Sequence, residues 1–192
     1  MSVNLTKGQS VNLTKPDGAT LTKVRMGLGW DARKAKGLFG KGKEKSIDLD
    51  ASCLLFDAAG TLVDQVWFAQ LASKDGSVRH TGDNRSGKGD GDDESLTVDL
   101  PAVTANVTTL VFVVNSYSGE TFSEIQNASC RLVDETTNTE VARYDLTGSG
   151  PHTAQIMAKV TRAGSTWTMT ALGAKTEGRT IKNMLPAVAN LL

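Results

Sequence analysis

The chain has 192 residues, of which 39% are hydrophobic, and its 21 basic and 21 acidic side chains balance to a formal charge of zero. This length allows one domain with a substantial core, and the balanced charge gives no global attraction toward nucleic acid or a membrane surface. No apolar run is long enough to span a bilayer, and no positive region followed by an apolar stretch begins the chain. We therefore expect a soluble intracellular protein with no transmembrane segment and no nucleic-acid partner.

The chain opens with a short repeat, in which residues 2–7 (Ser-Val-Asn-Leu-Thr-Lys) recur as residues 10–15. Each copy alternates apolar and polar side chains, which is typical of a half-buried strand. We expect the two copies to pair like a hairpin at a sheet edge, followed by a turn at Pro16-Asp17-Gly18.

A strand is predicted over residues 21–30, because most of its apolar side chains alternate with polar ones or glycine. Asp31 follows directly. At the end of a strand an aspartate is well placed as an oxygen ligand for a metal ion, and it is equally typical of the start of a turn. The sequence leaves both interpretations open.

Residues 32–46 carry six Lys or Arg side chains spaced by glycines, and Leu38 and Phe39 are the only large apolar residues among them. This composition predicts a mobile basic loop within the domain. Such a loop could bind an anion, but the glycine and lysine spacing of a phosphate-binding loop is absent, so a solvated loop is favoured.

The next strand, predicted over residues 47–57, places Asp48 and Asp50 on one face. Two neighbouring carboxylates repel each other unless they are solvated or share a cation or a basic partner. A tight turn at residues 58–60 leads into a strand at 62–69. Cys53 lies in the first of these strands and Cys130 further along, each among apolar or small residues, so we expect reduced, buried thiols.

The acidic segment, residues 82–94, contains five carboxylates and four glycines and no apolar side chain. Glycines let backbone carbonyls turn toward one point, and Ca²⁺ takes six to eight oxygen ligands. An EF-hand does not fit, because Arg85 and Lys88 occupy the positions of a ligand and of the turn glycine, and strand-like residues flank the segment. A calcium-binding loop and a solvated turn remain the two interpretations, and the density of carboxylates favours the first.

Residues 107–115 form the most apolar run and are rich in β-branched side chains, which predicts a central strand buried on both faces. Helical spacing near the end predicts a helix that begins near Asn183, since Pro186 is tolerated in a first turn. Many short strands with glycine turns and one terminal helix predict a mainly β fold, a β-sandwich formed by residues 1–192 as a single domain. Further strands are predicted at 77–81, 95–100, 128–134, 139–147, 152–162 and 165–173.

With these elements in place, the acidic segment resembles the signature of the TerD-like tellurite-resistance and stress-response family. Further matches follow in the family's order across nearly the whole chain: Val3-x-Leu5-x-Lys7-Gly8, Leu28-Gly29-Trp30-Asp31, Asp48-x-Asp50-Ala51-Ser52, Asn115-Ser116-Tyr117 and Phe122-x-x-Ile125-x-Asn127-Ala128. Ser86 stands where the family often has Thr, which keeps the hydroxyl. The Lys/Gly insertion at 33–45 is less typical, and its role stays open.

The resemblance implies a two-sheet β-sandwich that binds Ca²⁺, generally two ions, in acidic loops at one end. Carried over by position, loop ligands would be Asp83, Asn84, Gly87, Gly89, Asp92 and Glu94, the two glycines through their carbonyls. Asp31 and Glu124 are candidate ligands from neighbouring loops. Asp48, Asp50 and Asp90 would be ligands or would balance charge nearby.

The resemblance also implies a bacterial cytoplasmic stress protein associated with tellurite resistance, with related tellurite-resistance proteins at the inner membrane surface as partners. We expect no enzyme, because His80 and His152 have no nucleophile motif beside them and no histidine cluster is present to activate a metal. The preferred hypothesis is a Ca²⁺-dependent interaction module. Its alternatives are a metal-dependent hydrolase that uses the acidic segment and a purely structural Ca²⁺ site.

Overall fold

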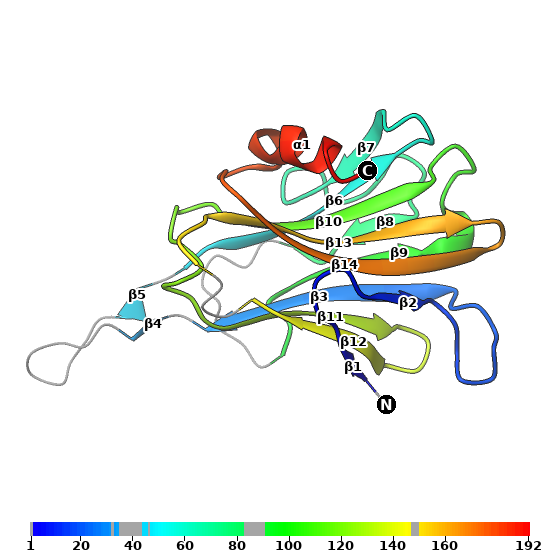
Figure 1. Ribbon diagram of the computed structural model, residues 1–192, viewed down its shortest axis with the longest axis horizontal. Coiled ribbons are helices and arrows are strands. Elements are labelled where there is room, and N and C mark those ends of the chain that lie inside the picture. Colours follow the sequence, from blue (N-terminus) through cyan, green and yellow to red (C-terminus); the bar gives the residue numbers. More distant parts are fainter. Residues whose placement is uncertain (1, 32, 35–43, 46, 83–90, 147–149) are drawn as a thin grey trace, which may run out of the picture.

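The computed structural model describes residues 2–31, 33–34, 44–45, 47–82, 91–146 and 150–192. Within these ranges the chain forms two six-stranded sheets packed face to face, a separate two-stranded ladder and one α-helix (Figure 1). The expected mainly β, two-sheet sandwich with a C-terminal helix is confirmed. No helix in the described residues has the length and apolar character needed to cross a membrane.

The first sheet, called sheet A here, runs in spatial order β1 (Val3–Asn4), β12 (Thr139–Asp145), β11 (Gln126–Asp134), β3 (Lys23–Asp31), β9 (Glu94–Asp99) and β8 (Val78–His80). Its neighbouring strands are antiparallel except β1 and β12, which are parallel. A short 3₁₀ helix, η1 (Leu100–Ala102), follows β9.

The second sheet, sheet B, runs in the order β2 (Ser10–Asn12), β14 (Thr166–Thr176), β13 (Ala154–Ala163), β10 (Thr109–Ser116), β6 (Leu49–Phe56) and β7 (Leu62–Val66). β10 lies between β13 and β6 and is buried along almost its whole length, which confirms the predicted central strand. Its β-branched side chains suit a strand that packs on both faces.

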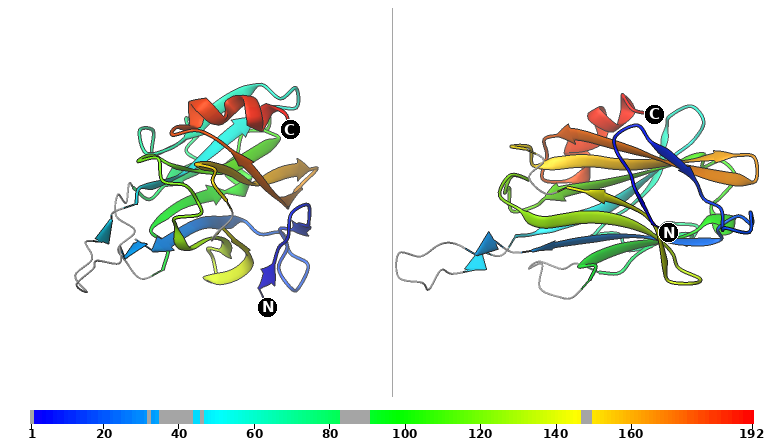
Figure 2. Two further views of the ribbon diagram at one scale, coloured as in Figure 1. Left: turned by 60° about the vertical axis from the view of Figure 1, so that its left-hand side comes forward. Right: turned by 60° about the horizontal axis from the view of Figure 1, so that its bottom comes forward.

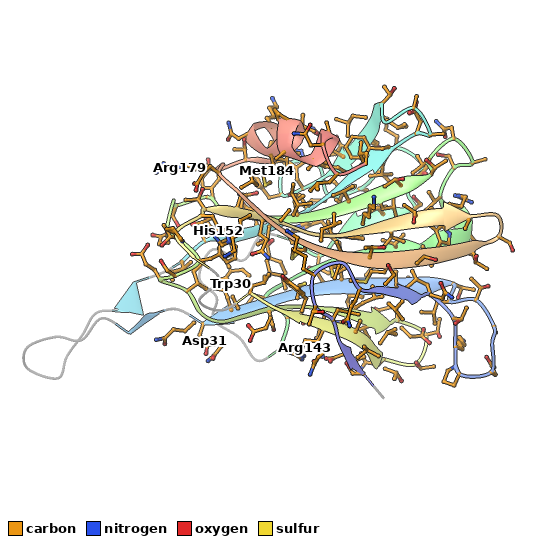
Figure 3. The ribbon with its side chains drawn as sticks, in the orientation of Figure 1. Trp30, Asp31, Arg143, His152, Arg179 and Met184 are labelled. Carbon is orange, nitrogen blue, oxygen red and sulfur yellow. The ribbon has the colours of Figure 1, made fainter. Side chains whose placement is uncertain are left out.

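Two hydrophobic layers result from the alternation of side chains along β10. Phe112 points into the layer between the sheets, whereas Val111 and Val113 point to the opposite face of sheet B. α1 (Ile181–Ala189) covers that face with Met184 and its neighbours (Figures 1 and 3). The outer face of sheet A instead carries charged side chains.

One end of the sandwich gathers the segments that matter for the candidate site, and we call it the loop end. β3 finishes there at Asp31, which pairs with Gln126 at the start of β11, while β9 begins there at Glu94. β4 (Arg33–Lys34) and β5 (Glu44–Lys45) pair beyond this end and project from the body (Figures 1 and 2). Residues 33–34 and 44–45 of the predicted basic loop therefore form a strand ladder, and residues 32, 35–43 and 46 lie outside the described residues.

The two copies of the N-terminal repeat do not pair with each other, so the expected hairpin is wrong. The first copy supplies β1, which pairs with β12 at the edge of sheet A, and the second supplies β2, which pairs with β14 at the edge of sheet B. The turn at Gly8, with φ of 86°, carries the chain from one sheet to the other. The same alternation of apolar and polar residues therefore forms an edge strand in each of the two sheets.

The helix begins at Ile181, earlier than predicted from Pro186, which lies inside it. Thr180 caps the helix in a capping box with Asn183, and this fixes the start. Pro186 cannot donate to the carbonyl of Lys182, and both residues lie on the exposed side of the helix. The cost of an internal proline is lower on a solvated face than in the core.

Asp75 offers a test of the turn that joins the sheet edges, because its carboxylate accepts hydrogen bonds from Ser73, from the backbone and hydroxyl of Ser77 and from the Thr104 amide. Burial raises the pKa of Asp75, but these bonds outweigh it and lower the pKa from 3.8 to about 2. The stability they provide is therefore full above pH 4 and is lost as the pH falls toward 2.

We predict that Asp75→Ala lowers the free energy of unfolding by about 1 kcal/mol at pH 7, a figure discounted for the solvent exposure of this carboxylate. Urea unfolding of both proteins at several pH values measures the difference, which should shrink between pH 4 and pH 2. A difference independent of pH would contradict the assignment.

Candidate metal site at the loop end

The acidic segment leaves β8 after His80 and returns to the body at Gly91, just before β9. Residues 83–90 lie outside the described residues. With them lie four of the predicted ligands, Asp83, Asn84, Gly87 and Gly89, as well as Asp90. The structure describes how the two limbs of the segment, at Gly82 and at residues 91–94, are attached to the sandwich.

The returning limb lies across β3 at two glycines. Asp93 donates its amide to the Leu28 carbonyl at 2.8 Å, and its carboxylate accepts the Trp30 amide at 3.0 Å. The Gly91 carbonyl lies 2.7 Å from where a Cβ on Gly29 would stand. Gly27 and Gly29 both face outward on β3, because the residues between and beside them point into the core. Their missing side chains make room for the limb.

Asp92 lies over Gly27 with its carboxylate between two guanidinium groups. Arg131 donates to the two carboxylate oxygens at 2.7 and 3.1 Å, and Arg25 donates to Oδ2. Arg131 is the cross-strand partner of Gly27, so the strand register itself brings these groups together. The Asp92 side chain is only 8% exposed, and its hydrogen bonds raise the pKa of Arg131.

These arginines belong to a larger ion network on the outer face of sheet A. Arg25 also pairs with Glu135 at 2.7 Å, and Arg131 approaches Glu140 at 3.6 Å. Arg143, directly opposite Arg131 in the sheet, pairs with Glu140 at 2.9 Å (Figure 3). The sequence reasoning missed this network. The sequence feature that could have indicated it is the alternation along β3, which places Arg25, Gly27, Gly29 and Asp31 on one face.

Glu94 is fully buried at the root of the returning limb. Its carboxylate accepts the Ala51 amide at 2.8 Å and lies 3.4 Å from Nε2 of His80. Nδ1 of His80 accepts the Gly82 amide at 3.0 Å, so Nε2 carries the proton and faces the Ala51 carbonyl at 3.1 Å. His80 thus contacts both limbs of the acidic segment.

Asp31 and Glu124 lie on neighbouring segments at the loop end, as expected. The exposed carboxylate of Asp31 accepts a hydrogen bond from Asn127 at 2.5 Å (Figure 3). Glu124 accepts from the amide and hydroxyl of Thr121, at 2.9 and 3.0 Å, within the turn before β11. The structure therefore brings four predicted residues, Asp31, Asp92, Glu94 and Glu124, to this end.

Asp50 lies in β6 of sheet B, and Asp48 directly precedes that strand. Asp50 is buried and accepts the side-chain amide of Asn115, its cross-strand partner, at 3.0 Å. The same amide group donates to the Arg179 carbonyl at 2.8 Å, which connects β10 to the segment that leads into α1. The hydrogen bond from the Asn115 amide thus stabilises the buried Asp50 carboxylate, for which the sequence analysis expected solvation, a cation or a basic partner.

Within the described ranges, no three His, Cys, Asp or Glu side chains converge closely enough to hold a metal ion. A complete site at the loop end would therefore require oxygens from residues 83–90. The donor chemistry fits Ca²⁺, because the segment and its flanks offer carboxylates, an amide side chain and backbone carbonyls, with neither Cys nor a second His beside them.

Both cysteines are free and buried, as expected. Burial raises the pKa of Cys130 to about 12 and that of Cys53 further, so neither forms a thiolate near neutral pH. The thiols of the folded protein are therefore poor nucleophiles and poor reductants.

Comparison with known proteins places this sandwich and its acidic segment in a family of bacterial resistance proteins. The TerD domain model matches residues 1–186. The chain is 47% identical to tellurium resistance protein TerZ of Serratia marcescens over 85% of each chain, and 40% identical to general stress protein 16U of Bacillus subtilis over 93% of each. A crystal structure of a homologue of telluride resistance protein TerD from Streptomyces coelicolor superposes with a TM-score of 0.72 at 19% identity, covering 88% of this chain and 98% of that one.

The fold and the acidic segment define a TerD-type β-sandwich. The chain belongs to the TerD domain family of tellurium-resistance and general stress proteins.

We predict that neither cysteine of the folded protein reacts with the thiol reagent DTNB at pH 8, and that both react once urea unfolds the chain. Absorbance of the released thiolate counts the reactive groups. Rapid reaction of a thiol in the folded protein would contradict the buried assignment.

We predict that Gly27→Ala destabilises the protein by about 1–3 kcal/mol, because the added methyl group overlaps the Asp92 carboxylate. Replacing glycine by alanine within a strand normally stabilises by roughly 0.5–1 kcal/mol, so the predicted sign is opposite to the usual one. Urea unfolding measures it.

The matched control is the same substitution made in an Asp92→Ala background. There the overlap is gone, and Gly27→Ala should be neutral or stabilising. Equal destabilisation in both backgrounds would place the steric conflict elsewhere.

Proposed function

We propose that this TerD domain binds Ca²⁺ at the loop end and acts as a Ca²⁺-dependent interaction module in the stress response, without enzymatic activity. The observation that carries the proposal is the attachment of both limbs of the acidic segment to the sandwich, with the returning limb bonded to Trp30, next to Asp31. His80 and Glu94 hold the root of the segment, and Asp93 holds its return against Leu28 and Trp30. A carboxylate-rich segment fixed at both ends and flanked by a further exposed carboxylate is a favourable arrangement for a hard cation.

The proposed ligand set combines residues that the structure describes with residues outside the described ranges. Asp31 is the described candidate with an exposed carboxylate, and Glu124 lies in the adjacent turn. The family resemblance implies Asp83, Asn84 and the carbonyls of Gly87 and Gly89 as further ligands, together with Asp92 and Glu94. Ca²⁺ would supply the positive charge that lets these oxygens lie close together.

Binding by ligands from separate segments supports an interaction module over a purely structural ion site. Asp31 ends β3, Glu124 precedes β11, and the acidic segment joins β8 to β9, so an ion bound among them would link three segments of the chain. Relatives bear the names of tellurium resistance and stress proteins, which motivates our proposal of a cytoplasmic protein that works with related tellurium-resistance proteins. The buried thiols argue against direct reduction of tellurite by this chain.

The test is calorimetric titration of the chelator-stripped protein with Ca²⁺ and, separately, with Mg²⁺. We predict two saturable Ca²⁺ sites, loss of at least one in Asp83→Asn, and binding about tenfold weaker in Asp31→Asn, equivalent to about 1.4 kcal/mol. Asp17→Asn, which changes an aspartate in the turn before β3, is the matched control and should bind like the wild type.

Absence of heat and of any thermal stabilisation by Ca²⁺ would contradict the proposal and make the acidic segment a solvated turn. Equal affinities in Asp31→Asn and the wild type would remove Asp31 from the ligand set.

A further inference from the structure

We propose that Arg25 and Arg131 are positioning residues for the acidic segment, and that the Asp92 carboxylate anchors the segment to sheet A instead of binding the ion. This inference rests on the proposed Ca²⁺ function, and it divides the acidic residues into those that bind the ion and one that holds the segment in place.

The contacts of Asp92 support the role of an anchor. Both carboxylate oxygens accept hydrogen bonds from guanidinium groups, with Arg131 bonded to both and Arg25 to Oδ2. The side chain is largely buried over Gly27, where a Cβ would overlap it. A Ca²⁺ ion on this carboxylate would have to share it with two cations or displace them. Charge-assisted, forked contacts of this kind define a geometry as well as an energy.

The neighbours of Asp92 in sequence show what the anchor would position. Asp93 comes next and bonds to Leu28 and to Trp30, and Trp30 directly precedes Asp31. Gly91 precedes Asp92, and its carbonyl lies over Gly29. The three residues 91–93 therefore all contact residues 27–30 of β3. With Asp92 held, the segment returns beside Asp31, the described candidate ligand.

Electrostatics distinguishes an anchor from a ligand, because the positive charge of two arginines close to a cation site should by itself weaken cation binding. If Asp92 is a direct ligand, removing Arg131 frees its carboxylate, removes a repulsive charge and strengthens Ca²⁺ binding. If Asp92 is an anchor, removing Arg131 loosens the returning limb and weakens binding. The two roles predict changes of opposite sign.

The experiment compares Ca²⁺ titrations of the wild type, Arg131→Gln, Asp92→Asn and the double variant at one ionic strength. We expect Arg131→Gln to bind Ca²⁺ about tenfold more weakly, and Asp92→Asn to add little in the Arg131→Gln background, since both remove the same contact. Binding as tight as the wild type, or tighter, in Arg131→Gln would overturn the inference.

Arg143→Gln is the matched control. It removes the same charge from the same face of sheet A, and Arg143 pairs with Glu140 and Ser129 instead of Asp92. Loss of charge alone should leave Ca²⁺ affinity unchanged or slightly raised. A loss in Arg143→Gln equal to that in Arg131→Gln would overturn the inference, because it would show a general effect of the face.

A second measurement separates failure of this inference from failure of the Ca²⁺ proposal. In the chelator-stripped protein, amide hydrogen exchange at Asp93 reports the attachment of the limb without any ion. We expect exchange to accelerate at least tenfold in Arg131→Gln and in Asp92→Asn, and to stay unchanged in Arg143→Gln. Unchanged exchange in the first two variants would overturn the anchor even if the wild type binds Ca²⁺. Accelerated exchange together with no Ca²⁺ binding would support the anchor and reject the ion site.

Discussion

The attachment of the acidic segment to β3 is the interaction on which the loop end depends. Carboxylates this dense repel one another, so the segment needs opposite charge and fixed donors to hold one path. The structure supplies them at the root and at the return: His80 and the Ala51 amide at Glu94, two arginines at Asp92, and the Trp30 amide at Asp93. The strand that ends at Asp31 thus forms the platform for the segment.

The two sheets serve different purposes in this arrangement. Sheet B is covered by α1 on one face and by sheet A on the other, and its strands β6 and β10 are buried along almost their whole length. Among the described residues, the inner face of sheet A packs against sheet B, and its outer face carries Arg25, Arg131 and Arg143 with their acidic partners and the returning limb of the acidic segment. The net charge of the whole chain is zero, but Arg25 and Arg131 are concentrated where they hold Asp92 of the acidic segment.

Periodicity and turn residues were sufficient to predict the sandwich, the central strand β10 and the position of Asp31 at a strand end. They could not predict the contacts of Asp92, because Arg25 and Arg131 reach it only through the pairing of β3 with β11, which no local pattern specifies. The hairpin predicted for the N-terminal repeat was wrong for the same reason, because two strands of identical sequence pair at the edges of two different sheets. Gly29 of the Leu28-Gly29-Trp30-Asp31 motif was recognised as part of a family feature, and the structure adds its physical cause, the close approach of the Gly91 carbonyl.

A crystal structure of the protein grown with Ca²⁺ would test the central claim most directly. We predict an ion at the loop end with an Asp31 oxygen at about 2.3–2.6 Å, and Asp92 still bonded to Arg25 and Arg131. Saturating Ca²⁺ with no ion bound beside Asp31 would contradict the proposed function. An Asp92 carboxylate turned away from the arginines and onto the ion would contradict the anchor.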